Sequence, residues 1–185
     1  MAGTQHLGKS DGTPGICQQP RNTLDDRGPV LRAMLMHLVE WVKHGKAPPP
    51  SRHPRLDDRS LVSFDAWKTQ FPKIPGFNLP THAYQPPRLD FGPRFHSEGI
   101  ADIIPPKVGK SFRALLPAVN ADGNETSGIV LPEVAVPLGT YTGWNLRSPQ
   151  VGAETMLSPL DGMFIPFAKT KAEREKTGDQ RLSLE

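Results

Sequence analysis

The stretch that most constrains the fold is residues 111–147, where local signals agree over the longest distance. An apolar run over 112–119 is followed by a polar turn and then by a second apolar run, rich in β-branched residues, over 129–138. Asp122-Gly123 lies between the runs, and Asp-Gly is a hairpin signal because glycine accepts positive φ and aspartate tolerates it. The sequence therefore predicts a β-hairpin here.

An amphipathic helix is expected near the start of the chain. Between residues 30 and 43 apolar side chains recur every three or four positions, which is the spacing of one helix face. Pro29 and Gly45 occupy the positions favoured just inside a helix start and just past a helix end. Asp25 or Asp26 is the expected N-cap residue.

The region between this helix and the hairpin is punctuated by proline. Residues 71–77 and 84–87 are expected to be extended, because proline removes a backbone donor and restricts the residue before it. A short helix is expected after Ser63 or Asp65. A second, charged helix over 169–176 has few apolar residues to anchor it and is expected to fray or to pack on residues outside this chain.

Four segments are therefore expected. They are 1–50 with a histidine-bearing loop and a helix, 51–110 as an extended wrapping segment, 111–168 with the hairpin, and 169–185 as a charged tail. Of the 185 residues 36% are hydrophobic, and proline and glycine make up about a fifth, so the core should be small and the loops numerous.

Several classes of function are disfavoured. The net charge is +3, and the basic residues are scattered rather than gathered on one face with aromatic side chains, so no nucleic-acid partner is expected. No apolar stretch approaches the roughly 18 residues of a membrane span, and the first residues do not read as a signal peptide. The chain as given is expected in the cytoplasm. Its single cysteine, Cys17, excludes an internal disulfide.

Candidate chemistry is sparse. Residues 8–12 match the G-x-S-x-G pattern around Ser10, but no hydrophobic strand precedes them and Pro14 follows, so the match is interpreted as chance. His37, Glu40 and His44 lie on adjacent helix turns and could hold a metal, yet solvated polar positions are the commoner case. No metal and no cofactor is expected. Three further side chains could line a pocket or act as packing anchors: Tyr141, Trp144 and Asn145.

Ordered motifs along nearly the whole chain resemble the carboxyl-terminal part of a bacterial alpha/beta-hydrolase domain family. Together they imply an α/β fold that contributes the last helix, extended by a loop-rich hairpin portion. The motifs are Gly3-Thr4-Gln5-His6, the segments 27–33, 38–42 and 45–52, Arg88 to Phe95, Leu116 to Glu125, Leu131 to Leu138, Thr140 to Arg147 and Ile165 to Ala168.

The resemblance implies a serine-type ester or acyl hydrolase whose triad runs Ser, acid, His along the chain. His6 is similar to the triad base, and Tyr141, Trp144 and Asn145 would lie near the substrate entrance. The nucleophile and the acid would lie upstream of Met1, so this chain alone is expected to be inactive. Its expected partners are a small ester-type substrate and the missing amino-terminal hydrolase portion. The intact relative could be exported through an upstream signal.

Two other functions remain open from the sequence. The chain could be a non-catalytic binding or assembly module that docks through the apolar face of helix 29–44. It could also be a self-contained hydrolase that uses Ser10. A Ser10→Ala variant that kept whatever ester hydrolysis the chain shows would exclude the second of these.

Overall fold

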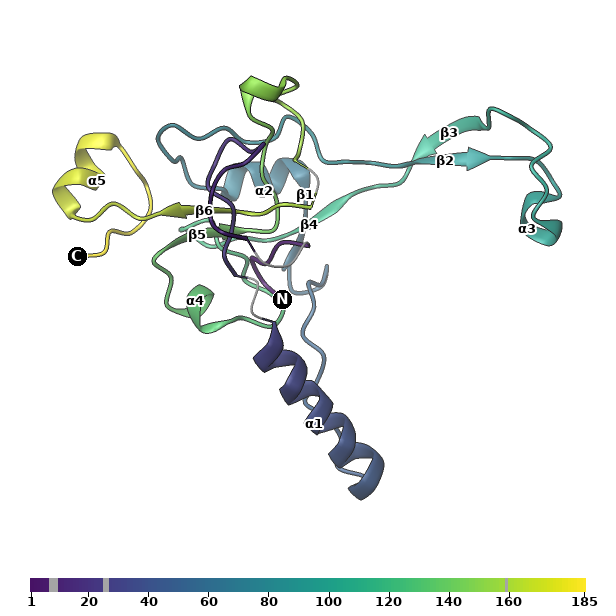
Figure 1. The fold of residues 1–185 in the computed structure, drawn as a ribbon, viewed down its shortest axis with the longest axis horizontal. Helices are drawn as coiled ribbons and strands as arrows, with labels where there is room; N and C mark the ends of the chain where they lie inside the picture. The colour runs from purple at the N-terminus through teal and green to yellow at the C-terminus, as the bar shows by residue number, and fades with distance from the viewer. Residues whose placement is uncertain (7–9, 25–26, 159) are drawn as a thin grey trace.

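The computed structural model of the chain describes residues 1–6, 10–24, 27–158 and 160–185 (Figure 1). Helices and short strands are mixed along the chain, as an α/β class requires. In order, the elements are α1 Gly28–His44, β1 Leu61–Ser63, α2 Phe64–Gln70, β2 Pro87–Asp90, α3 Phe95–Glu98, β3 Lys107–Ser111, β4 Leu115–Pro117, α4 Pro132–Ala135, β5 Gly139–Thr142, the 3-10 turn Pro149–Val151, β6 Met163–Pro166 and α5 Lys171–Thr177.

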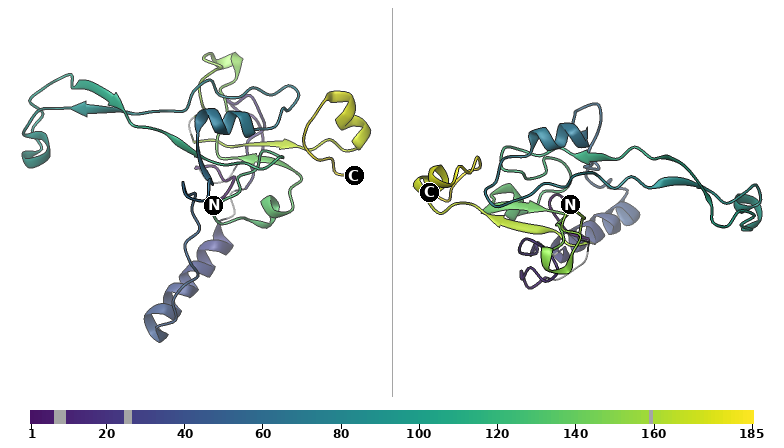
Figure 2. Two further views of the ribbon diagram at one scale, coloured as in Figure 1. Left: turned by 180° about the vertical axis from the view of Figure 1, so that it is seen from behind. Right: turned by 90° about the horizontal axis from the view of Figure 1, so that it is seen from above.

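The strands of the described ranges form three two-stranded sheets, and each pair is antiparallel. β1 pairs with β4 and β5 with β6 in the central body, whereas β2 and β3 pair in an arm that projects from it (Figures 1 and 2). In β5–β6, Gly139 faces Pro166 and Thr142 faces Met163. The described residues thus contain small sheets around one body rather than an open parallel sheet.

The core of the body forms where α2 packs near β6. Trp67, Phe71 and Ile74 are buried together with Met163 and Ile165. The predicted short helix after Ser63 is confirmed.

Local chemistry explains why α2 begins and ends where it does. The Ser63 hydroxyl accepts a hydrogen bond from the Ala66 N–H and so caps the first turn. The helix ends before Pro72, which cannot donate to a further turn.

Helix α1 is confirmed, with Gly45 in the left-handed conformation at its end. Its N-cap is Arg27 rather than an aspartate; Asp25 and Asp26 lie outside the described residues. The Arg27 guanidinium donates to the carbonyl oxygens of Gln5 and His6. α1 projects away from the body (Figure 1), and its large apolar side chains are exposed: Leu31, Met34, Leu35, Met36, Leu38, Trp41 and Val42.

The predicted hairpin is wrong in its pairing, although its turn forms. Gly123 has φ +77° and its N–H donates to the Asn120 carbonyl at 3.0 Å. The first run, however, supplies β4, which pairs with β1, and the second run contains α4 instead of a strand. Pro132 and Pro137 explain the difference, since both lack the N–H that a strand pair needs and Pro132 suits the first turn of a helix.

The segment 51–110, expected to wrap over a body, contributes to the body directly. α2 lies in the core, and only the later part of the segment, β2 with α3, extends outward in the arm (Figure 2). In the segment before α1, Ala2, Gln5 and Asn22 are buried. The division into four segments stays a prediction.

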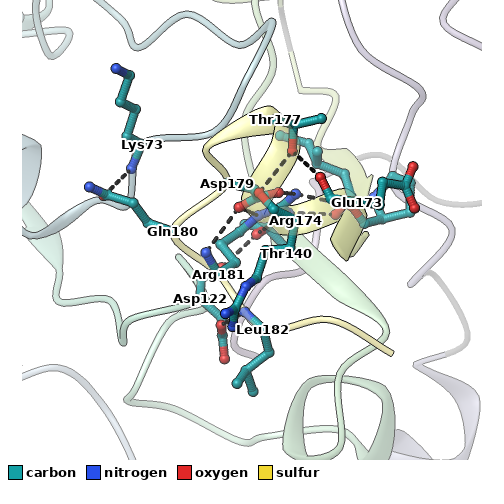
Figure 3. Close-up of polar contacts among 12 residues, drawn as sticks. Lys73, Asp122, Thr140, Glu173, Arg174, Thr177, Asp179, Gln180, Arg181 and Leu182 are labelled. Carbon is teal, nitrogen blue, oxygen red and sulfur yellow. Dashed lines mark hydrogen bonds and ion pairs between the residues drawn. The ribbon is translucent and has the colours of Figure 1, made fainter. Parts of the chain in front are cut away.

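The charged helix α5 is confirmed and ends at Gly178. The residues after it are fastened to the body by Arg181, whose side chain is 2% exposed (Figure 3). Its guanidinium donates to the Thr140 hydroxyl at 2.9 Å and to the Ile165 carbonyl at 2.8 Å, and it pairs with Asp179 at 2.8 Å. This anchor ties the carboxyl-terminal residues to both strands of β5–β6. In the described part of the chain, no helix is long and apolar enough to cross a membrane.

Candidate functional site

Two motifs that the sequence singles out lie against each other in the structure. Gly3, at φ +63°, approaches Tyr141 so closely that a Cβ on it would lie 3.0 Å from the Tyr141 carbonyl oxygen. A Cβ on Gly143 would lie 2.8 Å from the carbonyl oxygen of Thr4. Only glycine allows backbones to approach this closely, so the Gly3–His6 segment and the Tyr141–Asn145 segment form one unit.

Two buried amides hold this unit together. The Asn22 amide donates to the carbonyl oxygens of Gly3 and Thr142. The Gln5 side-chain oxygen accepts from the Gly162 N–H at 3.1 Å. Sequence reasoning missed both residues, because their partners lie far away along the chain and no local pattern marks them.

A cavity of about 320 Å³ lies beside this unit. Tyr141 and Trp144 contribute to its wall, which is one of the two roles that the sequence left open for them. Asn145 does not line it: this residue is fully buried, and its amide donates to the carbonyl oxygens of Gln19 and Gly162. Asn145 therefore orders the backbone after β5. Substrate binding by Tyr141 and Trp144 stays a prediction.

Most of the cavity wall is aromatic or aliphatic. Trp67 of α2 and Phe71, directly after that helix, meet the Trp144 ring edge-on, with ring centroids 5.6 and 6.1 Å away. Leu115 and Leu116 of β4 add aliphatic surface. The wall suits an apolar ligand, because such side chains dominate small-molecule pockets.

One carboxylate, Glu125, belongs to this wall. Its Oε2 accepts a hydrogen bond from the Gly3 N–H at 3.0 Å. Burial raises the pKa of the Glu125 carboxyl above its ordinary value, although the Gly3 hydrogen bond opposes the shift. A partly buried carboxylate in an apolar cavity is a candidate functional group. Sequence reasoning missed Glu125, because no local pattern separates it from the other carboxylates and its partner Gly3 lies 122 positions away.

His6 does not line the cavity. Its side chain is exposed, whereas its backbone is held: the His6 N–H donates to the Leu160 carbonyl at 3.2 Å, and its carbonyl accepts from Arg27 at 3.0 Å. Its role as a base stays a prediction. The imidazole is therefore presented at the surface by a fixed segment.

The candidate nucleophiles among the described residues are Ser10, Ser158 and Cys17, and hydrogen-bond contacts hold each of them in its local structure. Ser10 lies on irregular backbone, and its hydroxyl accepts from the Gly12 N–H; Gly8 and Lys9 of the same motif lie outside the described residues. Buried Ser158 and Cys17 contact each other at 3.2 Å, and Asp161 lies 3.3 Å from the Ser158 hydroxyl. Burial raises the pKa of the Cys17 thiol, so that it is held as the unreactive thiol rather than as the thiolate.

The described residues contain no cluster of side chains suited to binding a metal ion. No group of three or more histidine, cysteine, aspartate or glutamate side chains there could hold a metal ion.

Comparison with known proteins identifies the class. Residues 2–175 match the alpha/beta hydrolase domain family, and the chain belongs to that family. No curated protein and no solved structure matches the chain.

Replacing Glu125 with glutamine should make the protein more stable at neutral pH. A carboxyl whose pKa is raised in the folded state favours unfolding once it ionises; this cost grows as pH rises through the unfolded-state pKa and is complete above the folded-state pKa. Glutamine keeps an acceptor for Gly3 and carries no charge. The melting temperatures of the wild-type protein and of Glu125→Gln should differ at pH 7 and become similar near pH 4. A Glu125→Gln variant that is less stable than the wild-type protein at pH 7 would contradict this prediction.

Proposed function

We propose that this chain supplies the carboxyl-terminal part of a serine-type hydrolase that cleaves an ester or similar acyl bond, with His6 as the general base. The observation that carries the proposal is the family match over residues 2–175, together with the Gly3–His6 segment held against Tyr141–Asn145. The His6 backbone is fixed at both its N–H and its carbonyl while the imidazole is exposed. It is therefore free to meet a group from another segment.

The nucleophile and the acid are proposed to come from a hydrolase portion outside this chain. Among the described residues, Ser10 is on irregular backbone and Ser158 is 4% exposed beside a protonated thiol. Strand β1 leads directly into α2 with Ser63 at the junction, but no glycines flank Ser63, and its hydroxyl caps the helix by accepting from the Ala66 N–H. The exposed apolar face of α1 is a surface on which that portion could pack.

In this proposal His6 removes the proton from the serine hydroxyl as its oxygen attacks the substrate carbonyl carbon. The imidazolium then gives that proton to the leaving alcohol as the carbon–oxygen bond of the ester breaks. Water repeats the sequence on the acyl-enzyme and releases the acid. The chain described here contributes the proton-transfer group.

The test is the intact mass of the native species that carries residues 111–147, combined with labelling by a fluorophosphonate, which reacts with activated serines. We expect a species heavier than 20.3 kDa that takes the label. A native species of 20.3 kDa that takes no label would contradict the hydrolase proposal. A labelled species of that mass whose label is lost on Ser10→Ala substitution would overturn the assignment of the nucleophile to another portion.

A further inference from the structure

We propose that the cavity between α2, β4 and the segment after β5 is a binding site for a small, mainly apolar molecule that carries one hydrogen-bond donor, which it presents to Glu125. The proposal does not depend on the hydrolase proposal, since it rests on the cavity and its single carboxylate. At about 320 Å³, the cavity lies at the lower end of the range of small-molecule sites, which is roughly 300–1,000 Å³.

The apolar walls determine the body of the ligand. Trp67 is 4% exposed and Phe71 6%, so these rings are fixed by the core rather than free to close the space. The edge-on contact of Trp67 with Trp144 leaves ring surface on the cavity wall. Such surface favours a planar or aliphatic group of modest size.

The polar groups determine the rest of the ligand. Thr142 also contributes to the wall, but its hydroxyl donates to the Trp144 carbonyl and accepts from the Met163 N–H. Glu125 is the only carboxylate among the described residues that line the cavity, and a carboxylate in apolar surroundings gains most from an added donor. A hydroxyl group and an ammonium group both supply that donor, and the test separates them.

The chain contains three tryptophans, and they report on the location of binding. Trp67 and Trp144 line this cavity, whereas Trp41 lines a different groove along α1. Indole N–H signals in a nitrogen–proton correlation spectrum can therefore be followed as p-cresol, toluene or benzylamine is added. p-Cresol and toluene differ by one hydroxyl group, and benzylamine supplies an ammonium group at neutral pH.

We expect saturable shifts of the Trp67 and Trp144 signals, an unmoved Trp41 signal, and p-cresol or benzylamine binding about tenfold more tightly than toluene. The better of those two ligands identifies the donor as hydroxyl or ammonium. Glu125→Gln should remove the preference over toluene. Glu98→Gln, a matched change on exposed α3, should keep it.

Three results would overturn the proposal. One is equal affinity of the folded wild-type protein for toluene and for both donor ligands, because Glu125 would then select nothing. Another is a shift of Trp41 equal to those of the cavity tryptophans, which would mean unspecific binding to apolar surface. The third is no shift with any ligand. The wild-type comparison decides the matter even if Glu125→Gln fails to fold.

Discussion

Replacing Arg181 with methionine is expected to lower the free energy of unfolding by about 3–5 kcal/mol, as is usual when one partner of a buried ion pair is removed. Arg181 is 2% exposed, and its partner Asp179 6%. The substitution leaves the Asp179 carboxylate buried without its cation. It also removes the donors to the Thr140 hydroxyl (Figure 3) and to the Ile165 carbonyl, so β5 and β6 each lose a hydrogen bond to the carboxyl-terminal residues.

Urea denaturation at pH 7 measures this loss, and Arg174 offers a matched control. Arg174 also pairs with an acidic neighbour, Glu175, but at 3.7 Å and near the surface. Arg174→Met should therefore cost less than about 1 kcal/mol. A double change of Asp179→Asn with Arg181→Met should cost less than Arg181→Met alone, because no charge is left buried. If Arg181→Met and Arg174→Met lowered the free energy of unfolding equally, Arg181 would not be the stabilising anchor that we infer.

Because Asp179 is ionisable, the stability lost on replacing Arg181 with methionine should depend on pH. Burial by itself raises the pKa of Asp179, but hydrogen bonds and the charge of Arg181 outweigh burial and hold that pKa below its ordinary value. Stability from a lowered carboxyl pKa is present above the unfolded-state pKa and is lost as pH falls through the folded-state pKa. The difference in free energy of unfolding between the wild-type protein and Arg181→Met should therefore become smaller at acidic pH.

Helices α1, α2 and α5 could be predicted from the sequence because their signals are local, whereas α3 is not predicted and α4 lies where a strand is expected. Residue spacing and Gly45 define most of α1, Ser63 and Pro72 bound α2, and Gly178 ends α5. Caps and periodicity act within a few residues, and nothing in the rest of the fold opposes them here.

Strand pairing could not be predicted in the same way. The first apolar run of the expected hairpin pairs with β1, more than 50 positions away, although the Asp-Gly turn beside it forms. Burial of polar residues is equally non-local: Arg181 looks like part of a solvated tail until Thr140 and Ile165 are placed beside it. Long-range pairing of this kind leaves no periodic pattern near the residue itself.

The candidate site could be predicted only in part, because some of its residues carry a local signal and others do not. Tyr141 and Trp144 are large aromatic residues next to glycines, and that local pattern marks them as pocket or packing residues. Glu125 is one of many carboxylates in the sequence. Only the contact with Gly3, 122 positions away, and the apolar wall distinguish it. Asn145 is predicted to lie at the site, but its side-chain amide is occupied by hydrogen bonds to backbone carbonyl oxygens.

His6→Ala in the native species that carries this sequence is expected to lower kcat for ester hydrolysis by about 10⁶-fold, the usual consequence of removing the histidine of a serine-hydrolase triad. The imidazole is exposed while Arg27 and the Leu160 carbonyl hold the backbone, so truncation at Cβ should leave the fold intact. Steady-state kinetics with a p-nitrophenyl ester measures the loss, and a thermal melt checks the fold.

A control and a rescue separate catalysis from structure. His53, exposed in the proline-rich segment, is the matched control, and His53→Ala should leave kcat unchanged. Added imidazole should restore part of the activity of His6→Ala, because a small base can occupy the space that the side chain leaves, whereas it would not repair a folding defect. A folded His6→Ala protein with more than about a tenth of wild-type kcat would exclude His6 as the general base, since general-base catalysis alone contributes about 10²–10⁴-fold.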